Sequence, residues 1–312
     1  MKYLRRAVWI VLLVVALFGA LHSHSANAQT TGAVAAAQKP LYARLAWRRT
    51  SPTDLELDGD IPGATREQAK RYITREQLLA LPQVSYTVTN DANFSGPTQI
   101  SGVALDELVH ALAANSESDI AVAICSDGYA THYDHSYITA HHPALVLKIN
   151  GKDPADWPKF RENGAYMGPY LISSPDFKPS FKILSHDDEP QIPWGVVQLK
   201  IESEAAVFDA IRPRSPSANS PEVQDGYRIA QQNCFRCHNS GDEGGTKAQR
   251  PWTVLSAWAT ASPEYFAAYI HDPKSKNPKS QMQAFPNYDA ATLSALTKYF
   301  QSFSDAAKSG KP

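Results

Sequence analysis

The sequence predicts an α+β domain with a mixed sheet, followed by an all-α domain. Three observations lead to this prediction. Residues 40–211 contain short runs rich in β-branched residues, with turn signals between them. Residues 212–220 are rich in Pro and Ser and have no apolar periodicity, which is typical of a linker. In residues 221–312 the apolar residues recur at helical spacing.

The first 28 residues have the composition of a secretory signal peptide. Three basic residues precede an apolar run at residues 7–21, and Ala26-Asn27-Ala28 offers a small-x-small cleavage site. The run is short for a membrane span, so we expect cleavage near Ala28 and no stable span in the mature chain. An uncleaved anchor is the alternative. Residues 29–39 are small and polar and are expected to form a disordered leader.

Four runs of the first domain have strand composition, and two segments have helical composition. The strands are expected at 84–88, 120–124, 144–149 and 196–201, and the helices at 75–81 and 105–113. Turn signals stand at Ser126-Asp127-Gly128, Asn150-Gly151 and Asn163-Gly164.

Cys125 is the one cysteine of this domain. The chain has three cysteines and the other two belong to a single motif, so no structural disulfide is expected. Cys125 follows a hydrophobic strand, and free cysteines are commonly buried, which favours a structural role. A displaced metal ligand and a reactive nucleophile are the alternatives.

A cluster of aromatic and imidazole side chains follows Cys125. Its members are His132, Tyr133, His135, His141 and His142, called here the imidazole cluster, and Tyr129, Asp134 and Tyr137 are neighbours that could support it. Such groups could hold a metal or relay protons if they converged. A surface or loop cluster is the simpler reading, because the sequence does not show convergence.

The second domain carries the motif Cys234-Phe235-Arg236-Cys237-His238, which has the attachment pattern of c-type haem. Two thiols one helical turn apart can add to the two vinyl groups of a haem, and His238 can bind the iron. A thioredoxin-like pair would precede a long helix, and a zinc site would need two further ligands. A Gly-rich loop, 239–245, follows the motif, and there is no second Cys pair. The sequence therefore favours one covalent haem c, held by Cys234 and Cys237.

Three helices are expected around this motif. Ser220 can cap a helix that begins at Pro221, and Asp289 can cap the last helix. A helix at 263–270 should end before Pro273. Gly226 would let the first and last helices cross closely, with an aromatic side chain packed over it.

Met282 is the expected sixth ligand of the iron. The mature chain has two methionines, and Met282, unlike Met167, lies in the second domain, in a Pro-rich loop before the last helix. A thioether is a soft ligand that stabilises Fe(II). A buried core methionine is the alternative for Met282, and His271 is the competing ligand.

Residues 221–303 resemble a class I c-type cytochrome. The resemblance is carried by Cys234 to His238, by the loop 277–286 that contains Met282, and by the terminal aromatic helix. It implies His238 and Met282 as axial ligands, electron transfer, and a carbonyl near Pro251 beside the proximal imidazole. It also implies haem attachment outside the cytoplasm, so we expect a periplasmic protein.

Charge differs between the two domains. Residues 221–312 hold ten Lys/Arg and eight Asp/Glu, a net of +2, whereas residues 29–220 hold 17 and 23, a net of −6. Lys274, Lys276 and Lys279 precede Met282 and could steer an acidic redox partner protein to the haem edge. A solvated lysine loop is the alternative. No basic stripe indicates binding to nucleic acid.

Residues 50–205 resemble the sulfite-oxidase-like molybdopterin-binding domain. The order of DLELDG (54–59), ITREQLLALP (73–82), GVALDEL (102–108), SDGY (126–129) and LKINGK (147–152) carries this resemblance. The resemblance implies a molybdenum-ligating cysteine, but the corresponding stretch, 88–94, has none. Arg161 is the one arginine between 160 and 205, so a set of arginines for the pterin pyrophosphate is missing too. A molybdenum cofactor is therefore not expected.

These patterns favour electron transfer by a single haem c, with the first domain serving partner docking or orientation. The alternative is a redox enzyme of the sulfite-dehydrogenase kind, whose first domain binds a second cofactor and passes electrons to the haem. A haem-based sensor is a third class, disfavoured because His/Met ligation leaves the iron no open position.

Overall fold

The chain is described from a computed structural model over residues 40–64, 70–112, 118–175, 177 and 190–308. The predicted signal peptide, 1–28, and the predicted leader, 29–39, lie outside these residues. Within them, no helix is long and apolar enough to cross a membrane.

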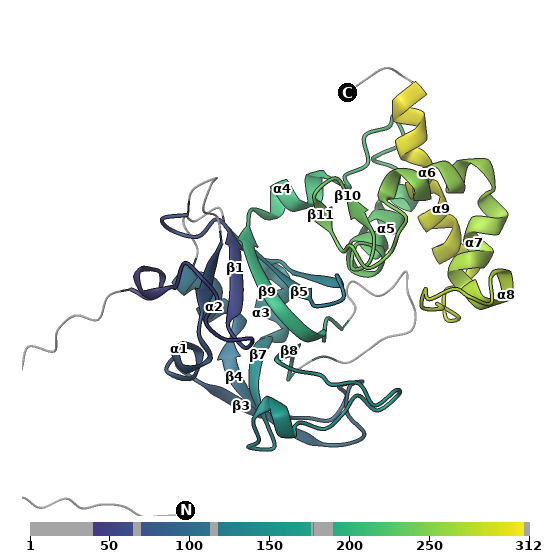
Figure 1. Cartoon of the computed structure of the whole chain (residues 1–312). Coiled ribbons are helices and arrows are strands. Elements are labelled where there is room, and N and C mark those ends of the chain that lie inside the picture. The colour runs from purple at the N-terminus through teal and green to yellow at the C-terminus, as the bar shows by residue number, and fades with distance from the viewer. Residues whose placement is uncertain (1–39, 65–69, 113–117, 176, 178–189, 309–312) are drawn as a thin grey trace, which may run out of the picture. The chain divides into compact units, whose positions relative to one another are not determined.

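A mixed sheet forms the first domain (Figure 1). The strands in the described residues are β1 (Leu55–Gly59), β2 (Arg71–Ile73), β3 (Val84–Val88), β4 (Thr98–Ala104), β5 (Ile120–Cys125), β6 (Ala130–Tyr133), β7 (Ala144–Ile149), β8 (Tyr170–Ser173) and β9 (Trp194–Glu202). They follow the order β2-β1-β9-β8-β7-β4-β3, with β5 paired to β9 and β6 paired to β5. β1 and β9 run parallel and the other pairs are antiparallel, which confirms the predicted mixed sheet.

The predicted strands and helices of this domain are confirmed. β3, β5, β7 and β9 lie where the β-branched runs are. β5 and β7 are buried along most of their length, whereas β3 alternates between partly buried and exposed side chains until the buried Val88. The helices are α1 (Arg75–Leu79), α2 (Leu105–Leu112), α3 (His135–His141) and α4 (Glu204–Asp209), with 3-10 turns η1 (Leu41–Arg44) and η2 (Pro154–Asp156). α1 begins with a capping box, in which the Thr74 side chain accepts from the Gln77 N–H and the Gln77 side chain accepts from the Thr74 N–H.

Helices α1, α2 and α3 bury their apolar side chains against the sheet. Leu78, Leu108 and Ile138, one from each helix, share a cluster with residues of β1, β5 and β9. A second cluster, which contains Val146, Met167 and other residues, forms a separate core. The sheet therefore stands between buried layers, and its strands are rigid supports for the turns that join them.

The second domain is helical, as predicted, apart from one two-residue ladder. Its elements are α5 (Pro221–Ile229), the π-helical turn η4 (Ala230–Cys234), β10 (Asn239–Ser240), β11 (Glu243–Gly244), α6 (Trp252–Ala261), α7 (Pro263–His271), α8 (Pro273–Lys276) and α9 (Ala290–Lys308). The Ser220 side chain accepts from the Val223 N–H, and the Asp289 carboxylate accepts from the Thr292 N–H, so both predicted caps are confirmed. The predicted linker residues, 212–220, contain turns but no helix or strand.

α5 and α9 cross at Gly226. A Cβ atom at Gly226 would lie 2.2 Å from the Ala295 carbonyl oxygen and 2.6 Å from the Tyr299 Cβ. The predicted close crossing, with an aromatic residue over the glycine, is confirmed. It brings the start and the end of the domain together around the motif that follows α5.

Helix α6 was not among the predicted helices. Its small residues, such as Ser256 and Ala259, give no clear apolar stripe, so local periodicity does not predict it. Trp252 anchors it in the core, where the indole N–H donates to the Tyr299 hydroxyl (3.2 Å). Tertiary packing rather than sequence periodicity defines this helix.

Candidate haem-attachment site

The Cys-x-x-Cys-His motif coils into one helical turn at the end of α5. The π-helical turn η4 ends at Cys234, and the N–H groups of Cys237 and His238 both donate to the Cys234 carbonyl (3.1 and 3.0 Å). The two thiols are therefore one turn apart, on the same short coil. Both cysteines are free and partly exposed. Burial raises the pKa of Cys234 to about 12 and also raises the pKa of Cys237, so both thiols are protonated at neutral pH.

The segment 234–247, called here the haem-attachment loop, folds back on itself through its glycines. The Gly245 N–H donates to the Phe235 carbonyl (2.8 Å), and a Cβ at Gly245 would lie 1.9 Å from the Arg236 carbonyl oxygen. Gly244 has φ 89°, and its Cβ would lie 2.4 Å from the Phe235 ring. Only glycine fits both positions, because a side chain would push the loop off the motif.

His238 is held by a backbone carbonyl. Its Nδ1 lies 2.7 Å from the Arg250 oxygen, and an N–H at Nδ1 that donates to this carbonyl leaves Nε2 as the nitrogen free to bind a metal. Burial lowers the pKa of His238, while the Arg250 carbonyl opposes this effect, and the net shift favours the neutral ring. The carbonyl belongs to the residue before Pro251, not to Pro251 itself.

Met282 lies in a loop that a buried serine fixes. The Ser280 Oγ accepts from the Met282 N–H (3.2 Å) and from the Tyr269 hydroxyl (2.9 Å). The partly buried Met282 side chain packs against the apolar cluster that contains Phe235. By contrast, His271 is exposed at the end of α7, and Met167 is fully buried in the first domain.

These groups fit a haem c. Two thiols one turn apart can form thioethers, an imidazole oriented through Nδ1 can bind iron, and a thioether follows in the same domain. Apolar side chains that a porphyrin could contact, among them Phe285 and Leu293, are partly buried around the same cluster as Met282.

Cys125 and the imidazole cluster do not form a metal site in the described residues. Cys125 is the last residue of β5 and is buried, as predicted, and burial raises the pKa of its thiol to about 12. His132 is buried on β6, whereas His135 and His142 are exposed at the two ends of α3. Within the described part of the chain, no group of three or more His, Cys, Asp or Glu could hold a metal ion.

The stretch 88–94 forms a hydrogen-bonded turn. The Asp91 carboxylate accepts from the Ser173 hydroxyl (2.6 Å) and from the Asn93 N–H (2.8 Å). The Asn93 amide donates to the Ile192 carbonyl (2.9 Å). Burial raises the pKa of Asp91, although these hydrogen bonds oppose the shift. Asp91 and Asn93 thus connect β3 to the segments around β8 and β9.

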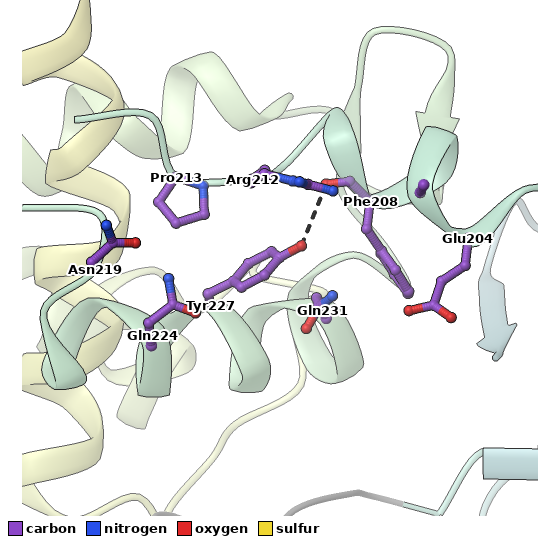
Figure 2. Close-up of a pocket in the computed structure, with 9 residues that line it drawn as sticks. Glu204, Phe208, Arg212, Pro213, Asn219, Gln224, Tyr227 and Gln231 are labelled. Atoms are coloured by element: carbon purple, nitrogen blue, oxygen red, sulfur yellow. Dashed lines mark hydrogen bonds between the residues drawn. The ribbon is translucent and has the colours of Figure 1, made fainter. Parts of the chain in front are cut away.

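An open cavity of about 360 Å³ lies between α4 and α5 (Figure 2). Sequence patterns do not predict it, because its lining comes from residues that are adjacent only in the fold. Most of its polar lining consists of Glu204, Arg212, Asn219, Gln224 and Gln231. In Figure 2 the Tyr227 hydroxyl points to the Phe208 carbonyl, to which it donates a 3.5 Å hydrogen bond.

Comparison with known proteins identifies the helical domain. Residues 221–300 match the family model described as cytochrome c oxidase, cbb3-type, subunit III. A search of curated proteins finds no match. Among solved structures, the chain is similar to the sulfane dehydrogenase SoxCD from Paracoccus pantotrophus, with 13% identity and a TM-score of 0.35, over 55% of this chain and 45% of that chain. The helical domain is a cytochrome domain, which implies haem c and electron transfer.

Proposed function

We propose that this chain is a periplasmic electron-transfer protein with one covalently bound haem c. Cys234 and Cys237 form the thioethers, His238 and Met282 bind the iron, and the sheet domain serves docking or orientation. Bound in this way, the haem would accept and release one electron at a time. The observation that carries the proposal is the 2.7 Å contact between His238 Nδ1 and the Arg250 carbonyl, which orients the imidazole beside the two thiols.

Residues around the site hold its loops in place and offer a charged surface to a partner. Ser280 and Tyr269 fix the loop that holds Met282, and the glycines of the haem-attachment loop keep it against the motif. Lys274, Lys276 and Lys279 are all exposed, near Met282 in the chain. We assign them to the docking of an acidic redox partner protein, because a cluster of exposed positive charges attracts a negatively charged surface.

The iron ligand is tested with two matched substitutions. Met282→Leu removes the thioether and keeps the apolar volume, whereas Met167→Leu makes the same change in the core of the sheet domain. We expect Met282→Leu to shift the reduction equilibrium at least tenfold toward oxidised haem. For one electron this lowers the haem reduction potential by about 59 mV or more. Spectroelectrochemical titration measures this, with Met167→Leu expected to match the parent. An unchanged potential in Met282→Leu would exclude Met282 as the ligand.

The number of cofactors is tested by metal analysis of the purified mature protein. One iron per chain, without stoichiometric molybdenum or copper, is the expected result. The turn made by Asp91 and Asn93 supports this expectation, because their side chains already bond to neighbouring segments. Stoichiometric molybdenum would instead favour an enzyme that oxidises a small substrate in the sheet domain, and copper would point to the imidazole cluster.

A further inference from the structure

The turn between β5 and β6 binds the haem-attachment loop through two backbone hydrogen bonds. The Ala130 N–H donates to the Arg236 carbonyl, and the Thr246 N–H donates to the Gly128 carbonyl, both at 2.8 Å. Arg236 lies between the two motif cysteines, and Thr246 follows the glycines. Each side thus donates one bond and accepts one, and both halves of the loop are attached to the sheet domain. All four residues belong to one compact unit, Lys39–Pro312.

Aromatic packing lies behind these hydrogen bonds. The His132 ring of β6 stacks on Phe235, with centroids 4.7 Å apart and planes 16° from parallel. Phe235 also packs edge-on against Trp252, with ring centroids 5.5 Å apart. Phe235 is completely buried, so the motif residue between Cys234 and Arg236 is enclosed by both domains.

Charged groups surround the contact. The Lys247 ammonium lies 2.7 Å from the Asp127 carboxylate and over the Tyr129 ring, and the Arg236 guanidinium donates to the Tyr129 hydroxyl (3.4 Å). Burial alone would raise the pKa of Asp127, but Lys247 and the Tyr129 N–H hold it below its usual value, so the carboxylate stays ionised. Both members of the ion pair are about half exposed, which places them at the rim.

Gly128 shows that the turn is shaped to receive the loop. Its φ is +81°, and a Cβ there would lie 2.5 Å from the Thr246 Oγ1 and 3.0 Å from the Lys247 backbone nitrogen. Glycine is needed for the turn and, independently, for the approach of the haem domain.

From these contacts we propose that residues 127–132, which form the β5–β6 turn and the start of β6, are a docking site for the haem-attachment loop. Through it the sheet domain holds the loop rigid and keeps water away from it. The inference deepens the proposed function and rests on it. Exclusion of water favours the reduced haem, because oxidised iron carries an additional positive charge that water would stabilise. The sheet domain thereby helps to set the reduction potential.

The test compares Gly128→Ala with Gly151→Ala in the full mature chain. Gly151 also has a positive φ, +73°, but a Cβ there meets nothing within 4 Å, so backbone strain is matched and only Gly128→Ala disturbs the contact. We expect Gly128→Ala to speed amide hydrogen exchange at Ala130 and Thr246 at least tenfold. We also expect the reduction equilibrium to shift at least threefold toward oxidised haem. At 59 mV per tenfold change, this lowers the reduction potential by about 28 mV.

A second pair of variants changes exposed lysines, so that the test does not depend on Gly128→Ala folding. Lys247→Met breaks the ion pair with Asp127, and Lys298→Met breaks the ion pair with Glu222 (2.6 Å), which is also exposed but distant from the turn in sequence. Both remove one positive charge from the haem domain. Exchange at Ala130 should rise at least threefold in Lys247→Met and stay at the parent value in Lys298→Met.

Covalent haem content is measured first in every variant. A parent chain without covalent haem would refute the proposed function. Full haem content, with equal exchange and equal potentials within each pair, would refute the docking site instead.

Discussion

His132 is a buried base whose ring nitrogens make no hydrogen bond in the described structure. Its backbone is well held, because the Gln191 side chain accepts from the His132 N–H and donates to the His132 carbonyl. Burial, with further contributions from Arg236 and Lys200, lowers the pKa of the ring to about 3. His132 therefore packs as a flat, neutral ring between the sheet and Phe235.

This residue makes stability depend on pH. An unfolded histidine binds a proton near pH 6.5, whereas native His132 does so near pH 3, so the unfolded state binds more protons between these values. The free energy of unfolding should fall as pH drops from 6.5 toward 3, by up to about 1.4 kcal/mol per pH unit from this group. His132→Phe should lose this part of the slope.

Urea unfolding at pH 7 and at pH 4.5 measures the slope. His135→Gln, at an exposed position, is the control and should keep the slope of the parent. A His132→Phe chain that loses stability on acidification as steeply as the parent would contradict the assignment.

At the scale of elements, the α5–α9 crossing depends on the missing side chain of Gly226. Gly226→Ala would place a methyl group against the Ala295 carbonyl and Tyr299. Alanine gains about 1 kcal/mol of helix propensity, but overpacking a fixed crossing costs about 1–3 kcal/mol. With contacts as short as 2.2 Å the cost should dominate, so we expect a net loss of about 1–2 kcal/mol.

Thermal or urea unfolding of the full chain checks this value. Gly96→Ala is the control, because a Cβ at Gly96 meets nothing within 4 Å, and its effect should stay within about 0.5 kcal/mol. Equal stability of the two variants would show that the crossing can open without cost.

The elements also show what local sequence can predict. β5 and β7 are predictable because burial on both faces demands a continuous apolar run. β6 contains Thr131 and His132 and has no such run, and only its pairing with β5 makes it a strand. The cysteine motif is predictable since its chemistry requires fixed local spacing. The fit of Gly128 against Thr246 is not, because residues far apart in sequence meet only in the fold.

At the scale of the molecule, charge is unevenly distributed. The cytochrome domain has a net charge of +2, whereas residues 29–220 have −6. The net charge of the whole chain does not show this difference, which orients the protein in the field of a charged partner. The exposed lysines before Met282 are the groups through which an anion would be attracted.

We therefore expect salt-dependent electron exchange with ferricyanide, an anionic oxidant. The double variant Lys276→Gln/Lys279→Gln should oxidise about two- to fivefold more slowly than the parent at low ionic strength, and the difference should vanish as salt screens the charges. Lys152→Gln/Lys159→Gln removes the same charge from exposed positions of the sheet domain and serves as control. Stopped-flow rates across a salt series measure both. Equal rates for the two double variants would contradict the assignment of these lysines to the docking surface.

The hydrogen bonds along β6 have a consequence for the order in which the chain is completed. β6 pairs with β5 on one side, and on the other its backbone is satisfied by Gln191 and by Arg236. Arg236 is synthesised long after β6, so the nascent sheet has an open strand edge until the cytochrome segment arrives. Open edges invite pairing with other chains. Truncation before the cytochrome domain should thus yield an aggregation-prone fragment, while the complete chain closes the edge with its own later residues.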